Sequence, residues 1–271
     1  MRDFLFLQKC SSEFTEMFIR TANHFKTPPQ KIISLVPSQT ELLWCLGLNN
    51  EVAGITKFCI HPNNWFQTKK RIGGTKNLNI ELMKSLQPDL VIANKEENTK
   101  EQVEELAEAL DVWITDVNNL EDALSMIKDV GNLIHKKKEA ERLIPEIQSK
   151  FSQLPTKNYK LQTCYLIWQN PFMTIGGDTF INDMMNYCGL ENVYKNHKRY
   201  PEITIDEINN TGCELILLSS EPYPFKQNHV DELQQILPGK KIILVDGEMF
   251  SWYGSRLLEA AEYFKELKKI L

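Results

Sequence analysis

Aromatic side chains are concentrated in the segments that follow the predicted β-strands of this chain. An aromatic ring offers a flat apolar wall with a polar edge, which suits a bulky, partly apolar ligand such as a macrocycle or a metal chelate. For any single ring, packing beneath its own loop is the alternative. The predicted ligand-binding residues are Phe58, His61, Lys76, Trp168, Phe172, Tyr200, Phe250, Trp252 and Tyr253.

Cys59 and His61 carry side chains that bind soft or borderline metal ions, and they lie two residues apart. Two ligands do not complete a metal site. Glu96, Glu97 or Asp178 would have to complete it, and nothing in the sequence brings these residues together. We therefore predict no metal site, keep Cys59 and His61 as weak candidates, and favour structural roles for both.

Three lysines lie on neighbouring predicted loops, namely Lys57, Lys76 and Lys95. Their ammonium groups would suit an anionic group on a ligand, and solvated lysines are the favoured alternative. The short motifs of nucleotide-driven and hydrolytic catalysis, GxxxxGK[ST], GxGxxG, GxSxG and HExxH, do not occur. We therefore predict no catalytic residue, no cofactor of the protein's own and a binding function.

Composition and charge are those of an ordinary globular protein. The 271 residues carry a formal net charge of -5, which argues against a nucleic-acid partner because such a partner selects a basic surface. The six cysteines are scattered without a CxxC pair, so we expect reduced, buried thiols. The first ten residues hold only a short apolar run, and no stretch is suited to span a membrane. Without a signal peptide, the protein is expected in the cytoplasm if its start is native.

Two groups of alternating strands and helices position these residues. The string KIISLV at 31–36 is typical of a buried strand, Pro37 ends it, and Ser38 with Glu41 fits an S-x-x-E capping box. The first group continues with strands at 52–56, 90–93 and 112–115 and helices at 80–86 and 99–110. The second group has strands at 163–168, 215–219 and 242–245 and helices at 180–188, 205–209, 230–237 and 255–270. This alternation predicts parallel sheets covered by helices.

Residues 118–154 contain the longest helical pattern. Apolar residues recur at helical spacing in the first half, where Asn118 and Glu121 resemble a capping pair. In the second half, residues 136–154 would span roughly 28 Å as a helix, enough to bridge two lobes. Pro145 costs about 3 kcal/mol in a helix interior, so we expect a kink there or two helices. The alternative is an ordinary surface helix inside one large domain.

The sequence therefore predicts an α/β fold of two Rossmann-like lobes with parallel sheets, joined by a long central α-helix. The predicted domains are an N-terminal lobe at 1–118, with an irregular lead-in at 1–30, linking helices at 119–157, and a C-terminal lobe at 158–271.

Two internal echoes support a duplication. NIELMKSLQPDLVIA at 79–93 resembles TIDEINNTGCELILLS at 204–219 in pattern and punctuation, and IGGT at 72–75 parallels IGGD at 175–178.

Several strings resemble those of the class III periplasmic binding proteins, the bilobed receptors with a helical backbone that feed cobalamin, ferric siderophores or haem to ABC importers. The strings are KIISLVPSQTELLWCLG, VAGIT, NIELMKSLQPDLVIA, GLENVY, and TIDEI ahead of CELILLS. The similarity extends from Lys31 to nearly the end of the chain. The P-S-x-T-E and L-x-P-D-L-V-I strings are specific for the fold and much less so for the ligand.

The resemblance implies a substrate-binding protein that holds a metal chelate in the cleft between its lobes for an ABC importer. The chelate would be a cobalamin-like corrinoid, a ferric siderophore or haem. Phe58 and Tyr200 match aromatic positions of the cobalamin-binding branch, whereas Thr75 departs from it. The protein would be a monomer in the periplasm or at the membrane surface. The alternatives are a cytoplasmic metal- or cofactor-handling enzyme of chelatase-like architecture and a cytosolic chelate sensor or store.

In that family an acidic side chain on each lobe docks on the membrane subunits of the importer, and the matching positions are Glu81 and Glu207. A structural explanation exists for both, because acidic residues favour the first turn of a helix, and Thr204 with Glu207 fits a capping box. The two roles are compatible, since a carboxylate at a helix start stays exposed.

Overall fold

The computed structural model describes residues 27–155 and 161–271, which fall into two compact units. Unit 1 comprises the described residues up to Val117 with Glu121–Glu146 and Tyr253–Arg256. Unit 2 comprises the described residues of Asn118–Leu120, Ile147–Trp252 and Leu257–Leu271. Of the predicted lead-in at 1–30, all but residues 27–30 lies outside the described residues. Neither unit is a continuous segment, and the predicted domain boundaries stay a prediction.

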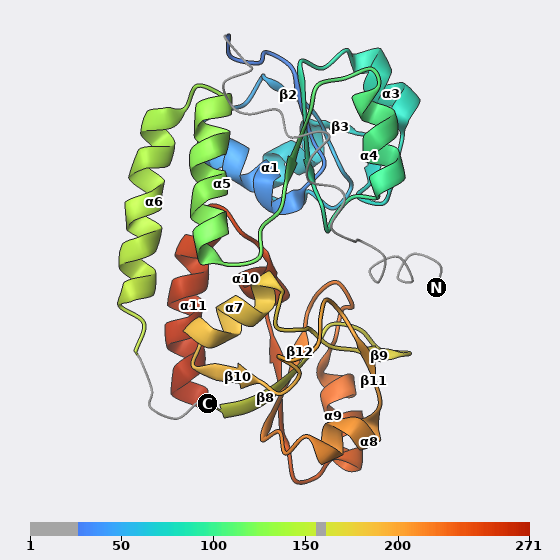
Figure 1. The fold of residues 1–271 in the computed structure, drawn as a ribbon, viewed down its shortest axis with the longest axis vertical. Helices are drawn as coiled ribbons and strands as arrows, with labels where there is room; N and C mark the ends of the chain where they lie inside the picture. The colour runs from blue at the N-terminus through green and yellow to red at the C-terminus, as the bar shows by residue number, and fades with distance from the viewer. Residues whose placement is uncertain (1–26, 156–160) are drawn as a thin grey trace. The chain divides into compact units, whose positions relative to one another are not determined.

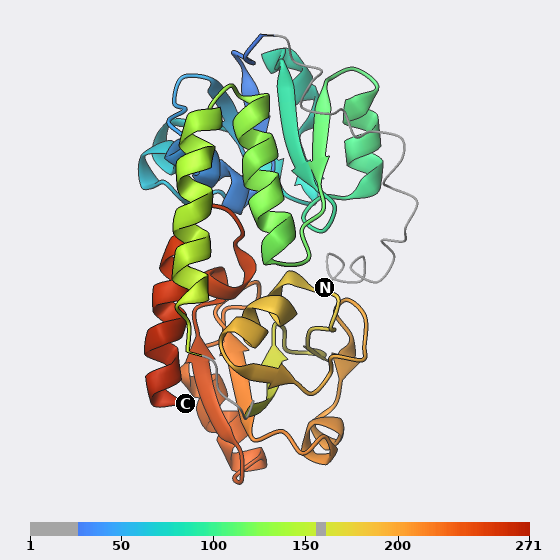
Figure 2. The ribbon, with the colours of Figure 1, turned by 60° about the vertical axis from the view of Figure 1, so that its left-hand side comes forward.

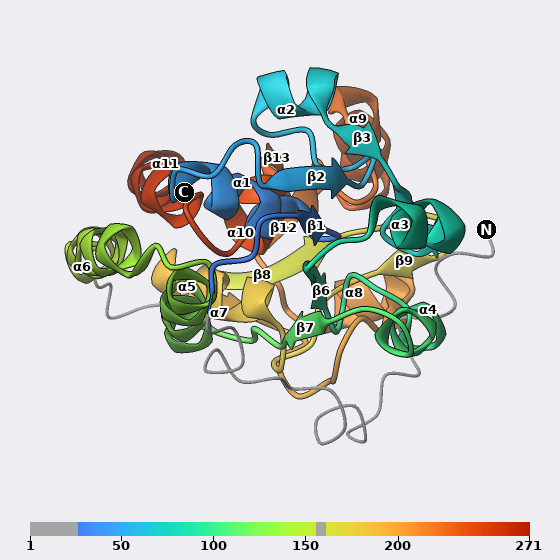
Figure 3. The same ribbon diagram turned by 90° about the horizontal axis from the view of Figure 1, so that it is seen from above.

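Unit 1 is built on a parallel sheet with helices on both faces (Figure 1). Its strands lie in the order β3 (Lys70–Arg71), β2 (Val52–Ile55), β1 (Ile32–Ser34), β6 (Leu90–Asn94) and β7 (Val112–Thr115). Helices α1 (Pro37–Cys45) and α5 (Leu120–Leu133) lie on one side, and α3 (Ile80–Leu86) and α4 (Lys100–Ala107) on the other, as the view in Figure 3 also shows. Every residue of β1 and β6 is buried, because both faces of these central strands are covered.

Four short elements of unit 1 were not predicted, namely strand β3 and the three that follow. Helix α2 (Asn63–Thr68) lies between β2 and β3 in the chain. The strands β4 (Gly73–Gly74) and β5 (Asn77–Leu78) form an antiparallel hairpin that leads directly into α3.

Unit 2 has a second parallel sheet, with the order β10 (Leu190–Asn192), β8 (Leu161–Leu166), β12 (Leu215–Ser219) and β13 (Lys241–Val245). Helices α7 (Phe180–Tyr187) and α11 (Leu257–Ile270) lie on one side, and α8 (Ile205–Asn210) and α9 (Gln227–Ile236) on the other. The short strands β9 (Phe172–Met173) and β11 (Glu202–Ile203) pair antiparallel ahead of α8, and α10 (Gly247–Ser251) follows β13. The α/β fold with parallel sheets is confirmed.

The predicted long helix is α6 (Lys137–Ser152), which runs alongside α5 (Figure 2). It continues through Pro145 as one helix, so the predicted alternative of two helices is wrong. Gly131 of α5 lets the two helices approach, because a methyl group there would lie 2.5 Å from the β-carbon of Ala140. Glu146 is assigned to unit 1 and Ile147 to unit 2, so this helix carries the chain from one unit into the other.

The predicted S-x-x-E capping box at the start of α1 is wrong. The N-cap is Val36, two residues before Ser38, so Pro37 is the first helical residue, and the apolar Val36 side chain makes no capping hydrogen bond. Glu41 instead pairs with Arg256, which lies 215 residues away in the chain. In the described part of the chain, no helix has the length and apolar character to cross a membrane.

Candidate ligand-binding loops and docking helices

The two sheets share a topological feature that selects the loops to inspect. In unit 1 the first strand, β1, lies between β2 and β6, and in unit 2 the first strand, β8, lies between β10 and β12. In unit 1 the chain continues from β1 toward one edge of the sheet and from the neighbouring β6 toward the other edge, and in unit 2 β8 and β12 behave in the same way. The loops at the carboxyl ends of each such pair of strands therefore diverge. Parallel sheets bind ligands at this point. In unit 2 it is bounded by the loops after β8 and β12.

An aromatic cluster occupies these two loops of unit 2. Trp168 follows β8 and Tyr223 follows β12, and their ring centroids are 5.4 Å apart at an interplanar angle of 70°. Both side chains are half-buried. Phe172, also half-buried, packs against the core of unit 2 together with Tyr223. The structure thus brings Trp168 and Phe172 to one region and adds Tyr223, which the sequence analysis had not selected.

Trp252 is held by a carboxylate of the same unit. Its indole N–H donates to Glu221 at 2.9 Å, and the Ser251 hydroxyl donates to the same carboxylate oxygen at 2.5 Å. Trp252 is 6 % exposed, so most of its ring packs inside the protein. Glu221 was missed by the sequence analysis because its partners lie 30 and 31 residues further along the chain.

Phe250 is a core residue of unit 2. Its side chain is fully buried, and its ring contacts Tyr165 at 5.3 Å and Phe264 at 4.8 Å between centroids. The sequence analysis assigned Phe250 to a loop, whereas it lies on α10 and packs inward. Because protein atoms enclose the ring, we leave Phe250 out of the proposed ligand set.

Tyr200 is half-buried and follows a segment fixed by the second glycine pair. The backbone N–H of Gly176 donates to the carbonyl of Arg199 at 2.6 Å, and a methyl group on Gly177 would lie 2.0 Å from the carbonyl oxygen of Lys195. The two glycines therefore allow the backbones to touch. Asp178 accepts a hydrogen bond from the backbone N–H of Arg199 at 2.6 Å, which locks the turn before Tyr200.

In unit 1, Phe58 is the most accessible of the predicted aromatic residues, with 49 % of its surface exposed. The Lys57 ammonium lies 5.0 Å from the centre of its ring, a cation–π contact. A β-carbon on Gly74 would lie 3.3 Å from the Phe58 ring, so the hairpin supports the ring from one side. His61 and Lys76 are half-buried.

A buried network of neutral polar side chains ties together the carboxyl ends of β6 and β7. The Gln39 and Asn94 amides donate to the Thr115 hydroxyl at 2.5 and 3.1 Å. The Asn98 amide donates to the carbonyl of Thr75 at 2.9 Å, so the turn that carries Lys76 is fixed to the loop after β6. The sequence analysis missed this network, and the recurrence of asparagine just after a buried strand was its available signal.

Tyr253 lies in unit 1, although the preceding strand, β13, belongs to unit 2. Its phenol is buried, and burial raises its pKa well above 10.0, followed by the nearby charges of Glu97 and Glu96. Burial also raises the pKa of the Glu97 carboxyl, which the Lys76 ammonium offsets in part. Lys76, Glu97 and Tyr253 are thus electrostatically coupled within unit 1.

The structure gives Cys59 a packing role. Its sulfur is fully buried and accepts a hydrogen bond from the Thr40 hydroxyl at 3.1 Å, with the Thr56 hydroxyl also at 3.1 Å. Burial raises the pKa of the thiol, which opposes the thiolate that a metal requires. Across residues 27–155 and 161–271, no three His, Cys, Asp or Glu side chains gather in a metal-binding arrangement.

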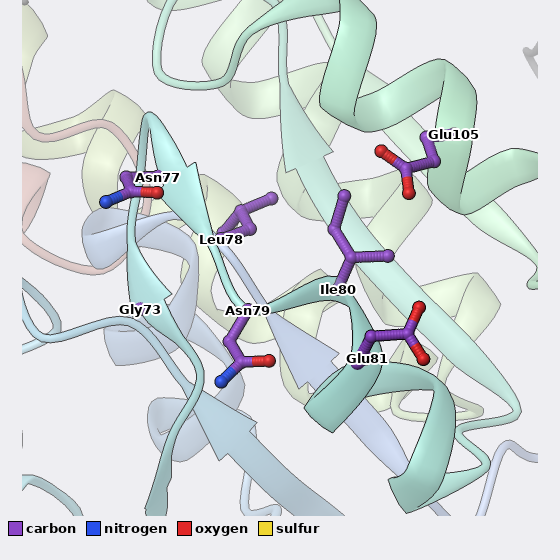
Figure 4. A pocket seen from close by; sticks show the side chains of 7 residues that line it. All are labelled: Gly73, Asn77, Leu78, Asn79, Ile80, Glu81 and Glu105. Carbon is purple, nitrogen blue, oxygen red and sulfur yellow. The ribbon is translucent and has the colours of Figure 1, made fainter.

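Glu81 lies in the first turn of α3 beside an open hollow of about 510 Å³ (Figure 4). The hollow is lined by the β4–β5 hairpin, the start of α3 and Glu105 of α4, and the Ile80 side chain lies between the two carboxylates. The Glu81 side chain is 87 % exposed, and it pairs with the Lys84 ammonium at 3.7 Å. A partner protein can therefore reach this carboxylate.

Glu207 is also exposed, but it takes part in the cap of α8. The Thr204 hydroxyl accepts from the Glu207 backbone N–H at 3.2 Å, and the Glu207 carboxylate accepts from the Thr204 backbone N–H at 2.6 Å. The capping box predicted from the sequence is present. These hydrogen bonds with Thr204 lower the pKa of the Glu207 carboxyl.

The internal echo has a structural counterpart. In both units an antiparallel strand pair leads to a side-chain N-cap, Asn79 for α3 and Thr204 for α8. Each helix is followed by a residue with positive φ, Gln87 at 49° and Gly212 at 69°, and then by a buried strand. The repeated route places α3 and α8 at equivalent positions of their units.

Comparisons with known proteins identify relatives of this architecture. A profile described as periplasmic binding protein matches residues 32–237. A vitamin B12-binding protein of Vibrio parahaemolyticus is 22 % identical over 211 residues, covering 76 % of each chain. An uncharacterized ABC transporter substrate-binding lipoprotein of Bacillus subtilis is 26 % identical over 255 residues, 89 % of this chain and 80 % of that protein. The crystal structure of the periplasmic vitamin B12 binding protein of Vibrio cholerae superposes with a TM-score of 0.76 at 19 % identity, over 90 % of this chain and 98 % of the other.

Proposed function

This chain belongs to the periplasmic binding protein family, and on that premise we propose that it is the substrate-binding component of an ABC importer and binds a metal chelate. The family consists of transport components and not of enzymes. The observation that carries the proposal is the match of most of the chain to vitamin B12-binding relatives, together with the aromatic rings at the carboxyl end of the unit 2 sheet.

The proposed ligand contacts come from the loops of each unit. In unit 2 they are Trp168, Phe172, Tyr200 and the exposed edge of Trp252. In unit 1 they are Phe58, His61, Lys76 and Tyr253, with Tyr253 contributing only its small accessible part. Among the three chelates, a corrinoid is favoured by the vitamin B12-binding relatives, and a ferric siderophore or haem is the alternative.

We place Glu81 and Glu207 at the contact with the membrane subunits of the importer. Both carboxylates are exposed, and they lie at equivalent helix starts of the two units. A cationic pocket on each membrane subunit would be their natural complement. The lipoprotein relative supports a location at the membrane surface or in the periplasm. We propose that the protein acts there as a monomer, with an N-terminal and a C-terminal lobe.

The test is to soak the purified protein separately with cyanocobalamin, haemin and a ferric hydroxamate, and to remove unbound chelate. Absorbance and native mass spectrometry then report what is retained. We expect one equivalent of an unchanged chelate. Chemical turnover of the chelate would contradict a binding function, and retention of none of the three would contradict the proposed ligand class.

A further inference from the structure

Tyr223 lies where the unit 2 sheet would contact a ligand. Strands β8 and β12 are neighbours, and Leu166 and Leu218 form their last register pair. The loops after these strands carry Trp168 and Tyr223, and the Tyr223 backbone N–H donates to the carbonyl of Ile167 at 3.3 Å. This backbone bond fixes the second loop against the first at the point where the strand order diverges.

His229 of α9 fixes the hydroxyl group of Tyr223. The Nδ1 atom of His229 accepts a hydrogen bond from the backbone N–H of Lys226 at 2.8 Å, at the start of the helix. An accepting Nδ1 carries no hydrogen, so the ring is neutral and its hydrogen lies on Nε2. Nε2 is 3.3 Å from the Tyr223 hydroxyl oxygen, and it must therefore donate to that oxygen.

The consequence for Tyr223 is that its own hydroxyl hydrogen remains available. Because the oxygen accepts from His229, the hydroxyl cannot also donate to the same nitrogen. Among the described residues, His229 is the one hydrogen-bond partner of this hydroxyl. The ring itself is steadied by Phe225, which is buried and lies 4.7 Å away between centroids. Tyr223 is thus a positioned donor on a half-buried ring.

Trp168 and Tyr223 meet at 70°, so their rings form a corner. A flat ring system stacked on one wall would present its rim to the other, where the phenol can donate a hydrogen bond to an oxygen at that rim. We propose that Tyr223 contacts the ligand and that His229 is its positioning residue, the ligand being a flat macrocycle with oxygen acceptors on its periphery. This inference rests on the proposed function, which supplies the chelate. Amide carbonyls of a corrinoid and carboxylates of haem share this chemistry.

The test compares Tyr223→Phe with the parent protein by titration with cyanocobalamin and with haemin. We expect about 2- to 10-fold weaker binding if the acceptor is a neutral amide, and about 10- to 100-fold weaker binding if it is a carboxylate. The size of the loss therefore distinguishes the two sources of oxygen. Tyr187→Phe is the matched control, because Tyr187 packs against Phe151 at the end of α7 and should leave both affinities unchanged.

His229→Asn tests the positioning role. The asparagine oxygen can replace Nδ1 as acceptor for the Lys226 N–H, so the helix start is kept while the contact with Tyr223 is lost. We expect weaker binding in the parent background and no further loss in the Tyr223→Phe background, with melting temperatures close to that of the parent. A purely structural role would weaken both backgrounds equally.

The outcomes separate the two proposals. If the parent binds a macrocycle and Tyr223→Phe binds it equally well, the inference is overturned and the proposed function stands. If the parent binds only the ferric hydroxamate, the macrocycle assignment is overturned while chelate binding survives. If the parent binds no chelate, the proposed function fails and the inference fails with it.

Discussion

The two units reach an exposed helix start by the same route but fix its acidic side chain differently. In unit 1, Glu81 extends from α3 and pairs with Lys84 of the same helix at 3.7 Å. In unit 2, the Glu207 carboxylate accepts from both the backbone N–H and the hydroxyl of Thr204, at 2.6 and 2.9 Å. To meet a partner, the first carboxylate gives up only an exposed ion pair with Lys84 of its own helix, whereas the second must share or release its cap.

The register of the repeat adds a further difference. When the N-caps Asn79 and Thr204 are aligned, Glu81 stands opposite Asp206 and not opposite Glu207. Asp206 is exposed and does not take part in the capping box. A repeated backbone route therefore does not by itself decide which side chain a partner contacts.

The largest effect is expected from reversing both docking charges. Glu81→Arg combined with Glu207→Arg should reduce chelate import in cells that depend on this protein by about 100-fold or more, because each reversal places like charges together at the contact. Chelate affinity should be unchanged. The matched control is Glu101→Arg combined with Glu232→Arg, which changes the same amount of charge at exposed positions of α4 and α9.

Single reversals sharpen this result. If Asp206→Arg reduces import and Glu207→Arg does not, the docking residue of unit 2 is Asp206, which is aligned with Glu81 in the repeat. Import unchanged in the Glu81→Arg and Glu207→Arg double variant would contradict docking at these helix starts altogether.

A second comparison concerns the carboxylates that precede the strands β6 and β12. Asp89 accepts from the backbone N–H groups of both Gln30 and Lys31, at 2.7 and 2.8 Å, whereas Glu214 accepts from that of Gln162 at the longer distance of 3.3 Å. Asp89→Ala should cost about 2 kcal/mol of stability and Glu214→Ala less than about 1 kcal/mol, because charged hydrogen bonds are the stronger kind. Denaturant unfolding of the two variants measures the difference. Equal losses would show that the shorter bonds in unit 1 carry no extra energy.

Interactions between residues close together in the chain could be predicted from the sequence, and interactions between distant residues could not. The Thr204–Glu207 box was predictable because its two partners lie three residues apart and face each other on any helix. The same pattern at Ser38 and Glu41 gave a wrong prediction. The helix begins at Pro37, ahead of Ser38, and the Glu41 carboxylate forms an ion pair with Arg256, near the end of the chain. A local motif cannot show such a distant competitor.

The ligand-binding residues show the same limit. The sequence placed Trp168 and Phe250 alike on loops after strands, but Phe250 lies on a short helix that turns it into the core. Tyr223 and its partner His229 are only six residues apart. Nothing in the sequence distinguishes this pair from two surface residues, because their roles depend on the tautomer that the start of α9 imposes.

A smaller effect should separate the two N-caps. Thr204→Ala removes a cap that also supports Glu207, whereas Asn79→Ala removes a single acceptor for the Leu82 N–H at 3.0 Å. Each substitution should cost about 1 kcal/mol, with the larger loss at Thr204. Hydrogen exchange of the amides in α3 and α8 reports the two helix starts separately. Thr204→Ser, which keeps a hydroxyl, should retain the protection of the α8 amides. A larger loss of protection in α3 of Asn79→Ala than in α8 of Thr204→Ala would contradict the expectation that Thr204 is the stronger cap.

The smallest effect is a pH dependence confined to α8. Hydrogen bonds from Thr204 hold the pKa of the Glu207 carboxyl below its ordinary value of 4.5, so the folded state favours the carboxylate. Its stabilising contribution is therefore fully present above pH 4.5 and is lost as the pH falls through the lowered pKa. As the pH falls through that range, the protection of the amides at the start of α8, measured relative to their intrinsic exchange rates, should decrease in the parent protein. In Glu207→Gln, the amide oxygen can still accept a hydrogen bond but does not titrate. The protection of these amides should therefore not change over this pH range. An equal loss of protection in both proteins would assign the pH dependence to another group. The cap would then not hold the Glu207 carboxylate, and a partner could reach it as easily as that of Glu81.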